Sequence, residues 1–234
     1  ILPGGLEGAP VAGTCARRAP NDPSEISVFK RRPAVRCWGA TADPLARVSG
    51  RSVSVVRIDT GEIIKTFMRN DAGDTDKPSA FPDSRVINAP LDSPMTGTPV
   101  VFPAEPGTVA QKFFMGDADG TIYKFDLTDT NPNNWKAELF FDTVNLSVET
   151  ASNSAQLGEP INVTPVLSLD SVGNVVLGVG TGDQENYTNV GTNYIYSITE
   201  KLAPGSTTLL PSVNWYLKLL DGERVSGPMA IFNS

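Results

Sequence analysis

The chain has 234 residues, of which 40% are hydrophobic and 19% charged, so it is long and apolar enough to bury a large core. Its 21 glycines and 19 prolines favour a chain with many turns over a helical protein. It has no histidine, which excludes a Ser-His-Asp triad, a Cys-His pair and any histidine-ligated metal within this chain. The net charge of -7 argues against nucleic-acid binding, which needs a basic face.

The sequence reads as a fragment of a longer protein. It begins at Ile1 rather than at a methionine and shows no signal peptide. It stops in an apolar stretch, residues 231–234, which resembles a strand cut short. No apolar run reaches the roughly 18 residues that a transmembrane helix needs, so no transmembrane segment is predicted in this chain.

Residues 1–49 are predicted to form a loop-rich segment that holds both cysteines, Cys15 and Cys37. Two interpretations remain open for this pair. The cysteines are two buried free thiols, or they form one disulfide that closes a long loop in an exported protein. We favour the disulfide, which by the loop-entropy model would stabilise the fold by about 3 kcal/mol.

Strand signals dominate residues 50–234. β-rich runs flank turn residues in four stretches, and a further strand is expected at residues 194–198. The four stretches are residues 52–67, 112–127, 163–177 and 214–225. No segment shows the 3.6-residue apolar stripe of an amphipathic helix. The pattern therefore predicts an all-β fold.

Part of this pattern repeats along the chain. Residues 56–61, 123–128 and 196–201 each form an alternating strand that ends in a polar turn. Aligned on Asp59, Asp126 and Thr199, these stretches lie 67 and 73 residues apart. Repeats of short antiparallel strands are typical of propeller blades, whereas a β-sandwich gives no reason for a repeat. We predict a partial β-propeller of about three to four blades over residues 50–234, truncated at its C-terminal end.

Aspartates in two loops are the candidates for a metal site. One group is Asp71, Asp74 and Asp76; the other is Asp117 and Asp119. Calcium is the ion that such oxygen ligands favour, but the first group lacks the spacing of an EF-hand loop. We favour a solvated acidic loop for the first group and a capped turn for the second. Without histidine, no serine or threonine has an evident base, so the sequence predicts no catalytic residues.

Five stretches resemble, in order, the C-terminal propeller of the PilY family. Residues 116–127 (GDADGTIYKFDL) resemble its "GDLxGNLWKFDL" blade motif, and residues 135–140 follow like its "W…LF" strand. The remaining three matches are residues 160–182 (PINVTPVLSLDSVGNVVLGVGTG), residues 194–198 (YIYSI), and residues 214–217 (NWYL) with residues 222–225 (GERV). The family's aspartate-rich calcium loop corresponds to residues 101–108, which hold one carboxylate, so we expect that site to be lost.

The PilY family comprises tip-associated adhesins and assembly factors of type IV pili. The resemblance implies a non-enzymatic propeller platform with minor pilins of the tip complex and host or abiotic surfaces as partners. It also implies an exported protein at the bacterial cell surface, at the pilus tip or in the outer envelope or periplasm.

Two alternatives to the pilus interpretation remain. The hairpin at residues 117–126 also resembles the quinoprotein alcohol dehydrogenases, propellers that use pyrroloquinoline quinone with calcium. Those enzymes carry a tryptophan in every blade, whereas Trp38, Trp135 and Trp215 do not recur at a blade period. The second alternative is a generic exported propeller scaffold without a pilus role.

The disulfide hypothesis predicts that an oxidised sample has no reactive thiol. A thiol titration before and after reduction measures this. Two titratable thiols before reduction would show that Cys15 and Cys37 are not bonded to each other.

Overall fold

The computed structural model describes residues 2–3, 50–68, 83–91, 93–118, 120–143, 160–184, 192–203 and 205–232. These residues form strands and two short 3-10 helices, η1 (Asp83–Arg85) and η2 (Pro132–Asn134), so the all-β prediction is confirmed. No helix in this described part is long and apolar enough to cross a membrane. Both cysteines lie outside it, and the disulfide stays a prediction.

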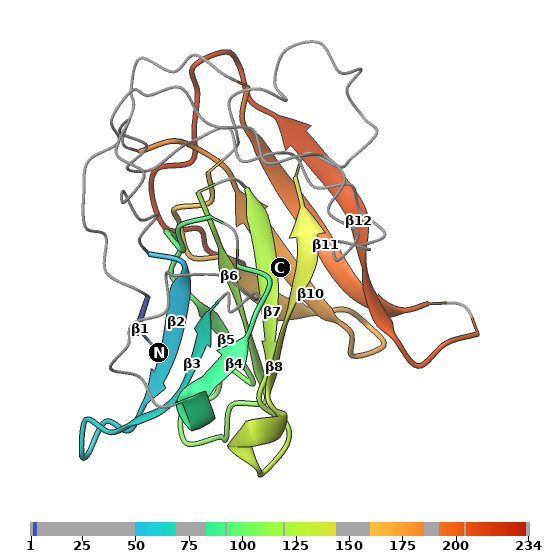
Figure 1. Ribbon diagram of the computed structural model, residues 1–234. Coiled ribbons are helices and arrows are strands. Elements are labelled where there is room, and N and C mark those ends of the chain that lie inside the picture. The colour runs from blue at the N-terminus through green and yellow to red at the C-terminus, as the bar shows by residue number, and fades with distance from the viewer. Residues whose placement is uncertain are drawn as a thin grey trace, which may run out of the picture.

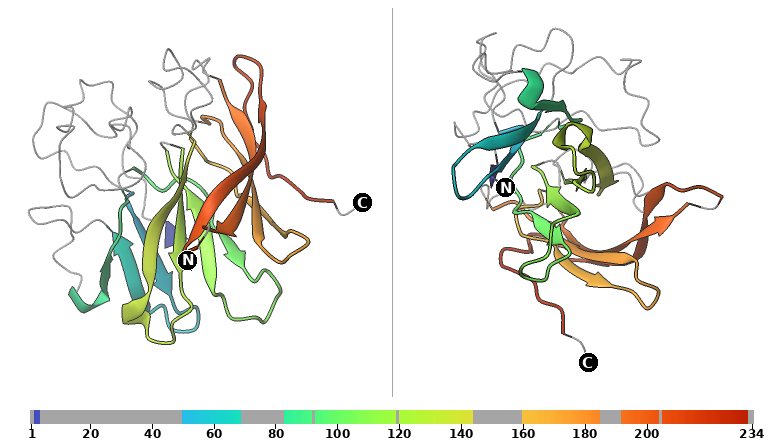
Figure 2. Two further views of the ribbon diagram at one scale, coloured as in Figure 1. Left: turned by 90° about the vertical axis from the view of Figure 1, so that its right-hand side faces the viewer. Right: turned by 90° about the horizontal axis from the view of Figure 1, so that it is seen from below.

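The strands form three four-stranded sheets, each made of strands consecutive in the chain. Sheet A contains β1 (Leu2–Pro3), β2 (Ser52–Val56), β3 (Ile63–Met68) and β4 (Val86–Asn88). Sheet B contains β5 (Val100–Phe102), β6 (Lys112–Gly116), β7 (Thr121–Asp126) and β8 (Lys136–Asp142). Sheet C contains β9 (Val166–Leu169), β10 (Val175–Gly180), β11 (Tyr194–Leu202) and β12 (Leu209–Lys218). Sheet B lies between sheets A and C (Figures 1 and 2).

One strand departs from the predicted antiparallel pattern. β4 pairs with β3 in parallel, with Phe67 opposite Ile87, while the other pairings within the described strands are antiparallel. A parallel neighbour needs a crossover of about a dozen residues or more, and the connection over residues 69–85 provides that length. In addition, Leu2 and Pro3 pair with β2, so part of the segment expected to be loop-rich belongs to sheet A.

The two central strands of sheet B, β6 and β7, are buried on both faces. Successive side chains of a strand point to opposite faces, so one strand can supply two cores. On β7, Tyr123 and Phe125 join the core shared with sheet A, and Ile122 joins the core shared with sheet C. On β6, Phe113 belongs to the first core and Phe114 to the second. Sheet B is therefore the layer on which the other two sheets pack.

Sheets A and B are joined by an aromatic contact and a buried lysine. Phe67 of β3 meets Phe125 of β7 edge to face, with ring centroids 5.1 Å apart. Lys65, also on β3, is 6% exposed and donates hydrogen bonds to the Ser84 carbonyl and, at 2.5 Å, to Asn133 Oδ1 of η2. These hydrogen bonds satisfy an ammonium group whose burial would otherwise be costly.

A buried ion-pair network joins sheets B and C. Glu200 of β11 is 2% exposed and pairs with Lys112 of β6 and with Lys124 of β7, at 3.1 Å from the Lys124 ammonium. Lys124 also lies 2.5 Å from Glu138 of β8. Burial lowers the pKa of Lys124, but the hydrogen bonds and charges of Glu138 and Glu200 outweigh it, and the pKa is raised overall.

Loss of the Lys124 charge is expected to weaken this contact. The Lys124→Met variant leaves the buried Glu200 with one cation fewer, which should cost on the order of 3 kcal/mol of unfolding free energy at neutral pH. Urea denaturation of both proteins measures the difference. A variant as stable as the wild type would mean that the network contributes nothing net.

Alkaline pH should have the same effect on the wild type. Because folding raises the pKa of Lys124 above its ordinary value of 10.5, the stabilisation is complete below that pH and is lost as the pH rises through the folded-state pKa. The wild-type melting temperature should therefore fall more steeply above pH 10.5 than that of Lys124→Met, which no longer has this titrating group. Parallel curves would contradict the assignment.

Candidate functional site

The motif stretches singled out in the sequence meet at one end of sheets B and C. Ile161, just before β9, donates its backbone N–H to the carbonyl of Asp117 at 3.0 Å. Gly182, after β10, donates to Pro160 at 2.8 Å, and Val225, after β12, donates to Thr181 at 3.1 Å. We call this region the junction and define it as residues 116–118, 160–162, 180–183, 193 and 223–225. Residues 160–162 are where the chain passes from sheet B to sheet C, and the other junction residues lie at strand ends and connections of these two sheets.

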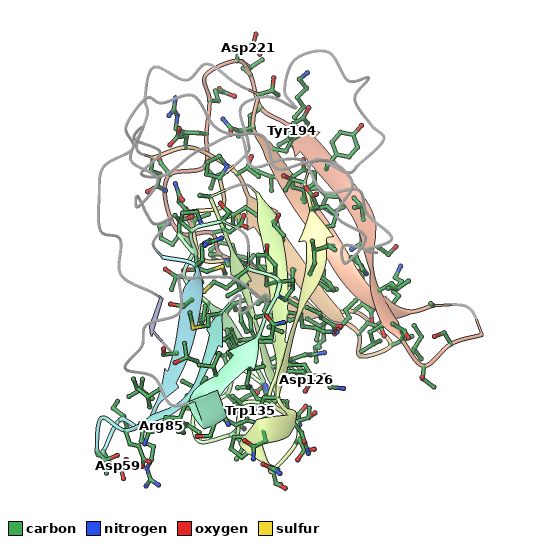
Figure 3. All side chains as sticks on the ribbon, in the orientation of Figure 1. Asp59, Arg85, Asp126, Trp135, Tyr194 and Asp221 are labelled. Carbon is green, nitrogen blue, oxygen red and sulfur yellow. The ribbon has the colours of Figure 1, made fainter. Side chains whose placement is uncertain are left out.

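The junction includes the start of the β6–β7 turn and lies at the opposite end of the molecule from the β2–β3 and β7–β8 turns. In Figure 3, Tyr194 and Asp221 mark the junction end, whereas Asp59 and Asp126 lie at the other end with Trp135. Asp59 and Asp126 are two of the positions on which the sequence repeat was aligned. Asp59 follows β2, and Asp126 is the last residue of β7.

The connection between sheets is itself repeated, a feature that the sequence reasoning missed. The pattern P-x-x-x-T-P-V occurs at residues 94–100, before β5, and again at residues 160–166, before β9. In both copies the proline carbonyl accepts a backbone hydrogen bond, from Ala118 at 2.9 Å in the first copy and from Gly182 in the second. The residue after the proline donates in both, Met95 to Gly50 at 2.9 Å and Ile161 to Asp117. This repeat was the sequence signal for the junction.

Two motif glycines allow the close packing found at the junction. A Cβ atom on Gly180 would lie 2.6 Å from Cγ2 of Val225, closer than real side chains approach. Gly116 packs in the same way under the side chain of Ile161, where a Cβ atom would overlap it. Glycine is thus required at both positions by the segment that crosses it, because no larger residue leaves room for that segment.

The polar side chains of the junction bond mainly to backbone. Arg224 donates from Nη1 to the Asp183 carbonyl at 2.6 Å, and Asn193 donates from Nδ2 to the Glu223 carbonyl at 2.7 Å. Thr181 is fully buried, and its hydroxyl accepts the backbone N–H of Tyr194 at 2.9 Å. These bonds hold the loops that leave the sheets in fixed positions.

Of the predicted metal ligands, the structure describes Asp117 alone. This residue is fully buried, and its Oδ1 accepts the backbone N–H of Thr121 at 2.8 Å across a turn in which Gly120 has a φ of 87°. Asp71, Asp74, Asp76 and Asp119 lie outside the described residues. Within the described ranges, no three acidic or cysteine side chains gather closely enough to hold a metal ion. Calcium binding stays an untested prediction.

Comparison with known proteins gives one distant likeness. No family model matches the chain, and no curated protein matches it. Among solved structures, it is similar to the crystal structure of the Pseudomonas aeruginosa PilY1 C-terminal domain, with 15% sequence identity and a TM-score of 0.39. The likeness covers 66% of this chain and 32% of that one, so the chain spans about a third of its length. This TM-score is too low to carry a conclusion about function.

The close packing at Gly180 can be tested with a matched glycine. We expect Gly180→Ala to lower the unfolding free energy by about 1–3 kcal/mol, because the new methyl group overlaps Val225. Gly227→Ala is the control, since a Cβ atom there has no neighbour within 4 Å. Removing the opposing side chain in Gly180→Ala/Val225→Ala should recover part of the loss. Equal stability of the two single variants in urea denaturation would contradict the proposed role.

Proposed function

We propose that the chain is a propeller module of a PilY-type surface protein, a non-enzymatic pilus assembly factor and tip-associated adhesin. The observation that carries this proposal is the convergence of the family-like motifs. The "GVGTG" stretch at residues 178–182 and the "GERV" stretch at residues 222–225 are far apart in sequence, yet Val225 packs directly over Gly180 and bonds to Thr181. Contact between the two motifs gives a physical reason for their occurring together.

The arrangement of the sheets supports the propeller part of the proposal. Three four-stranded sheets follow one another along the chain, and each packs on the next through aromatic side chains. The connections into β5 and β9 use the same backbone hydrogen bonds. Radial repetition of four-stranded sheets is the plan of a propeller, and we propose that these sheets are successive blades.

The proposed partners are minor pilins of the tip complex and the host or abiotic surface to which the cell attaches. A rigid array of sheets suits this role, because binding surfaces on loops are effective when a fixed scaffold positions them. The junction provides such fixation, since Arg224 and Asn193 tie the chain after β12 to the loop after β10. Export to the bacterial surface belongs to the same proposal.

The proposal is tested by deleting the gene in the source organism and complementing it with matched variants. Wild type and Gly227→Val should restore surface pili or attachment, whereas Gly180→Val should not, because a valine at Gly180 disrupts the junction. Pili are counted by electron microscopy, and attachment is measured on the same cells, with protein levels checked by immunoblot. Loss of pili indicates an assembly role, and normal pili with weak attachment indicate adhesion. A deletion that changes neither would overturn the proposal.

A further inference from the structure

The hairpins β2–β3, β7–β8 and β11–β12 differ in how the outer side of their second strand is protected. In sheet A this strand, β3, is covered by β4, and Ala89 donates its backbone N–H to the Met68 carbonyl of β3 at 3.0 Å. In sheet B it is β8, the last strand of the sheet, and three of its seven residues are charged. Charged side chains hinder the pairing of an edge strand with another chain. Sheet A is thus protected here by a strand, and sheet B by charge.

The second strand of the hairpin in sheet C, β12, has neither form of protection. It is the last strand of its sheet, and among the described strands none lies on its outer side (Figure 1). Its ten residues carry one charge, on Lys218 at the C-terminal end. Trp215, Tyr216 and Leu217 are 56%, 44% and 54% exposed, and we call these three residues the open edge. A long, exposed edge strand with so little charge is a site at which another strand is expected to pair.

The backbone of the open edge points hydrogen-bonding groups away from β11 at Tyr216. Leu219 donates its backbone N–H to the Asn193 carbonyl at 2.9 Å, so these two residues form a hydrogen-bonded pair across the hairpin. Hydrogen-bonded and non-hydrogen-bonded pairs alternate along an antiparallel ladder. Leu217 therefore points its N–H at β11, whereas the N–H and carbonyl of Tyr216 point outward. Pro211 falls on another outward position, where its missing N–H leaves the ladder intact.

The side chains of the open edge present apolar surface on both faces of the sheet. Successive residues of a strand point to opposite faces, so Trp215 and Leu217 lie on one face and Tyr216 on the other. Tyr216 contacts Tyr194 of β11, with ring centroids 6.1 Å apart. A strand beside the open edge would therefore cover apolar side chains on both faces at once. The open edge itself has no charge that would repel an identical segment.

We propose that the occupant of the open edge is a second copy of this chain, whose own open edge pairs with it antiparallel. A two-fold dimer needs a surface that is complementary to itself, and an uncharged strand with an outward donor and acceptor on one residue is such a surface. The two copies of sheet C then form one continuous sheet held by main-chain hydrogen bonds. A further sheet would pack on the face of sheet C and not on this edge, so the proposal depends neither on the propeller nor on the pilus role.

Dimerisation of the purified protein is measured by sedimentation velocity over a range of protein concentrations. We expect a dimer whose fraction grows with concentration. Tyr216→Ser and Tyr216→Pro are the matched variants, because both remove the ring but only the proline removes the outward N–H. Each Tyr216→Pro dimer loses two donors, so its dissociation constant should be roughly tenfold or more above that of Tyr216→Ser.

Melting temperatures, measured where the proteins are monomeric, show whether the proline variant is folded. Because the Tyr216 N–H does not bond to β11, Tyr216→Pro should melt within about 3 °C of Tyr216→Ser. Leu217→Pro removes an N–H that points at β11, and it should melt lower than Tyr216→Pro by roughly 5 °C or more. A Tyr216→Pro variant as unstable as Leu217→Pro would contradict the outward direction of that N–H and overturn the proposal.

Photo-cross-linking of the purified protein locates the contact. The photoreactive amino acid p-benzoylphenylalanine is placed at position 215 or 217 and, as a control, at position 210, because Leu210 is 46% exposed on the same strand but lies before the register shift. Positions 215 and 217 should react several-fold more than position 210, with residues 209–220 of the second copy. Because the two strands run antiparallel, the residue reached from position 215 should lie C-terminal to the residue reached from position 217.

Three further results would overturn the proposal. A monomer at every concentration would mean that no second copy binds. Equal dissociation constants for Tyr216→Pro and Tyr216→Ser would mean that the dimer does not use the outward backbone of β12. Cross-links from positions 215 and 217 to residues outside 209–220, or in the reversed order, would show a different surface or a parallel arrangement.

Discussion

The burial of β7 on both faces is the constraint on which the rest of the structure depends. Because side chains alternate along a strand, a slip of one residue would move Lys124 into the aromatic core with sheet A and Phe125 toward Glu200. Such a slip is unfavourable, because an ammonium group without a counter-charge is costly in an apolar core and Glu200 would lose its partner. The pairing of Lys124 with Glu200 therefore fixes the strand register of sheet B and the placement of sheet C at the same time.

Much of the fold was predictable because it depends on local patterns. The hairpins at residues 112–127 and 163–177 follow from β-rich runs around turn residues, and the structure has β6–β7 and β9–β10 there. The repeat aligned on Asp59 and Asp126 predicted equivalent positions for β2 and β7. The turns that follow these two strands do lie at the same end of the molecule. β4 was not predictable in the same way, since three residues carry no period and its parallel pairing depends on a long connection.

The site was less predictable because it depends on contacts between distant residues. No local pattern connects Lys124 with Glu200, 76 residues away, and a lysine in an apolar strand is more often read as solvent-facing. The contact of Gly180 with Val225 also joins residues far apart in the chain. The need for glycine at position 180 is explained only by Val225, which packs directly over it. The repeated P-x-x-x-T-P-V pattern was the one visible signal, and it marks the entries to sheets B and C rather than a strand.

Consecutive strands make up each sheet, and this has a consequence for biosynthesis. Apart from β1, every strand pairs with neighbours close to it in the chain, and the described cores join sheet A to B and sheet B to C. A sheet emerging from the ribosome can therefore fold on one already completed, without waiting for the C-terminal part of the chain. Sheet A would then be complete before sheet B exists to cover it, and sheet B before sheet C, so the newest sheet of the growing chain displays an unprotected apolar face until the next one folds on it. That transient exposure is the stage of synthesis at which a chaperone would have the most surface to bind.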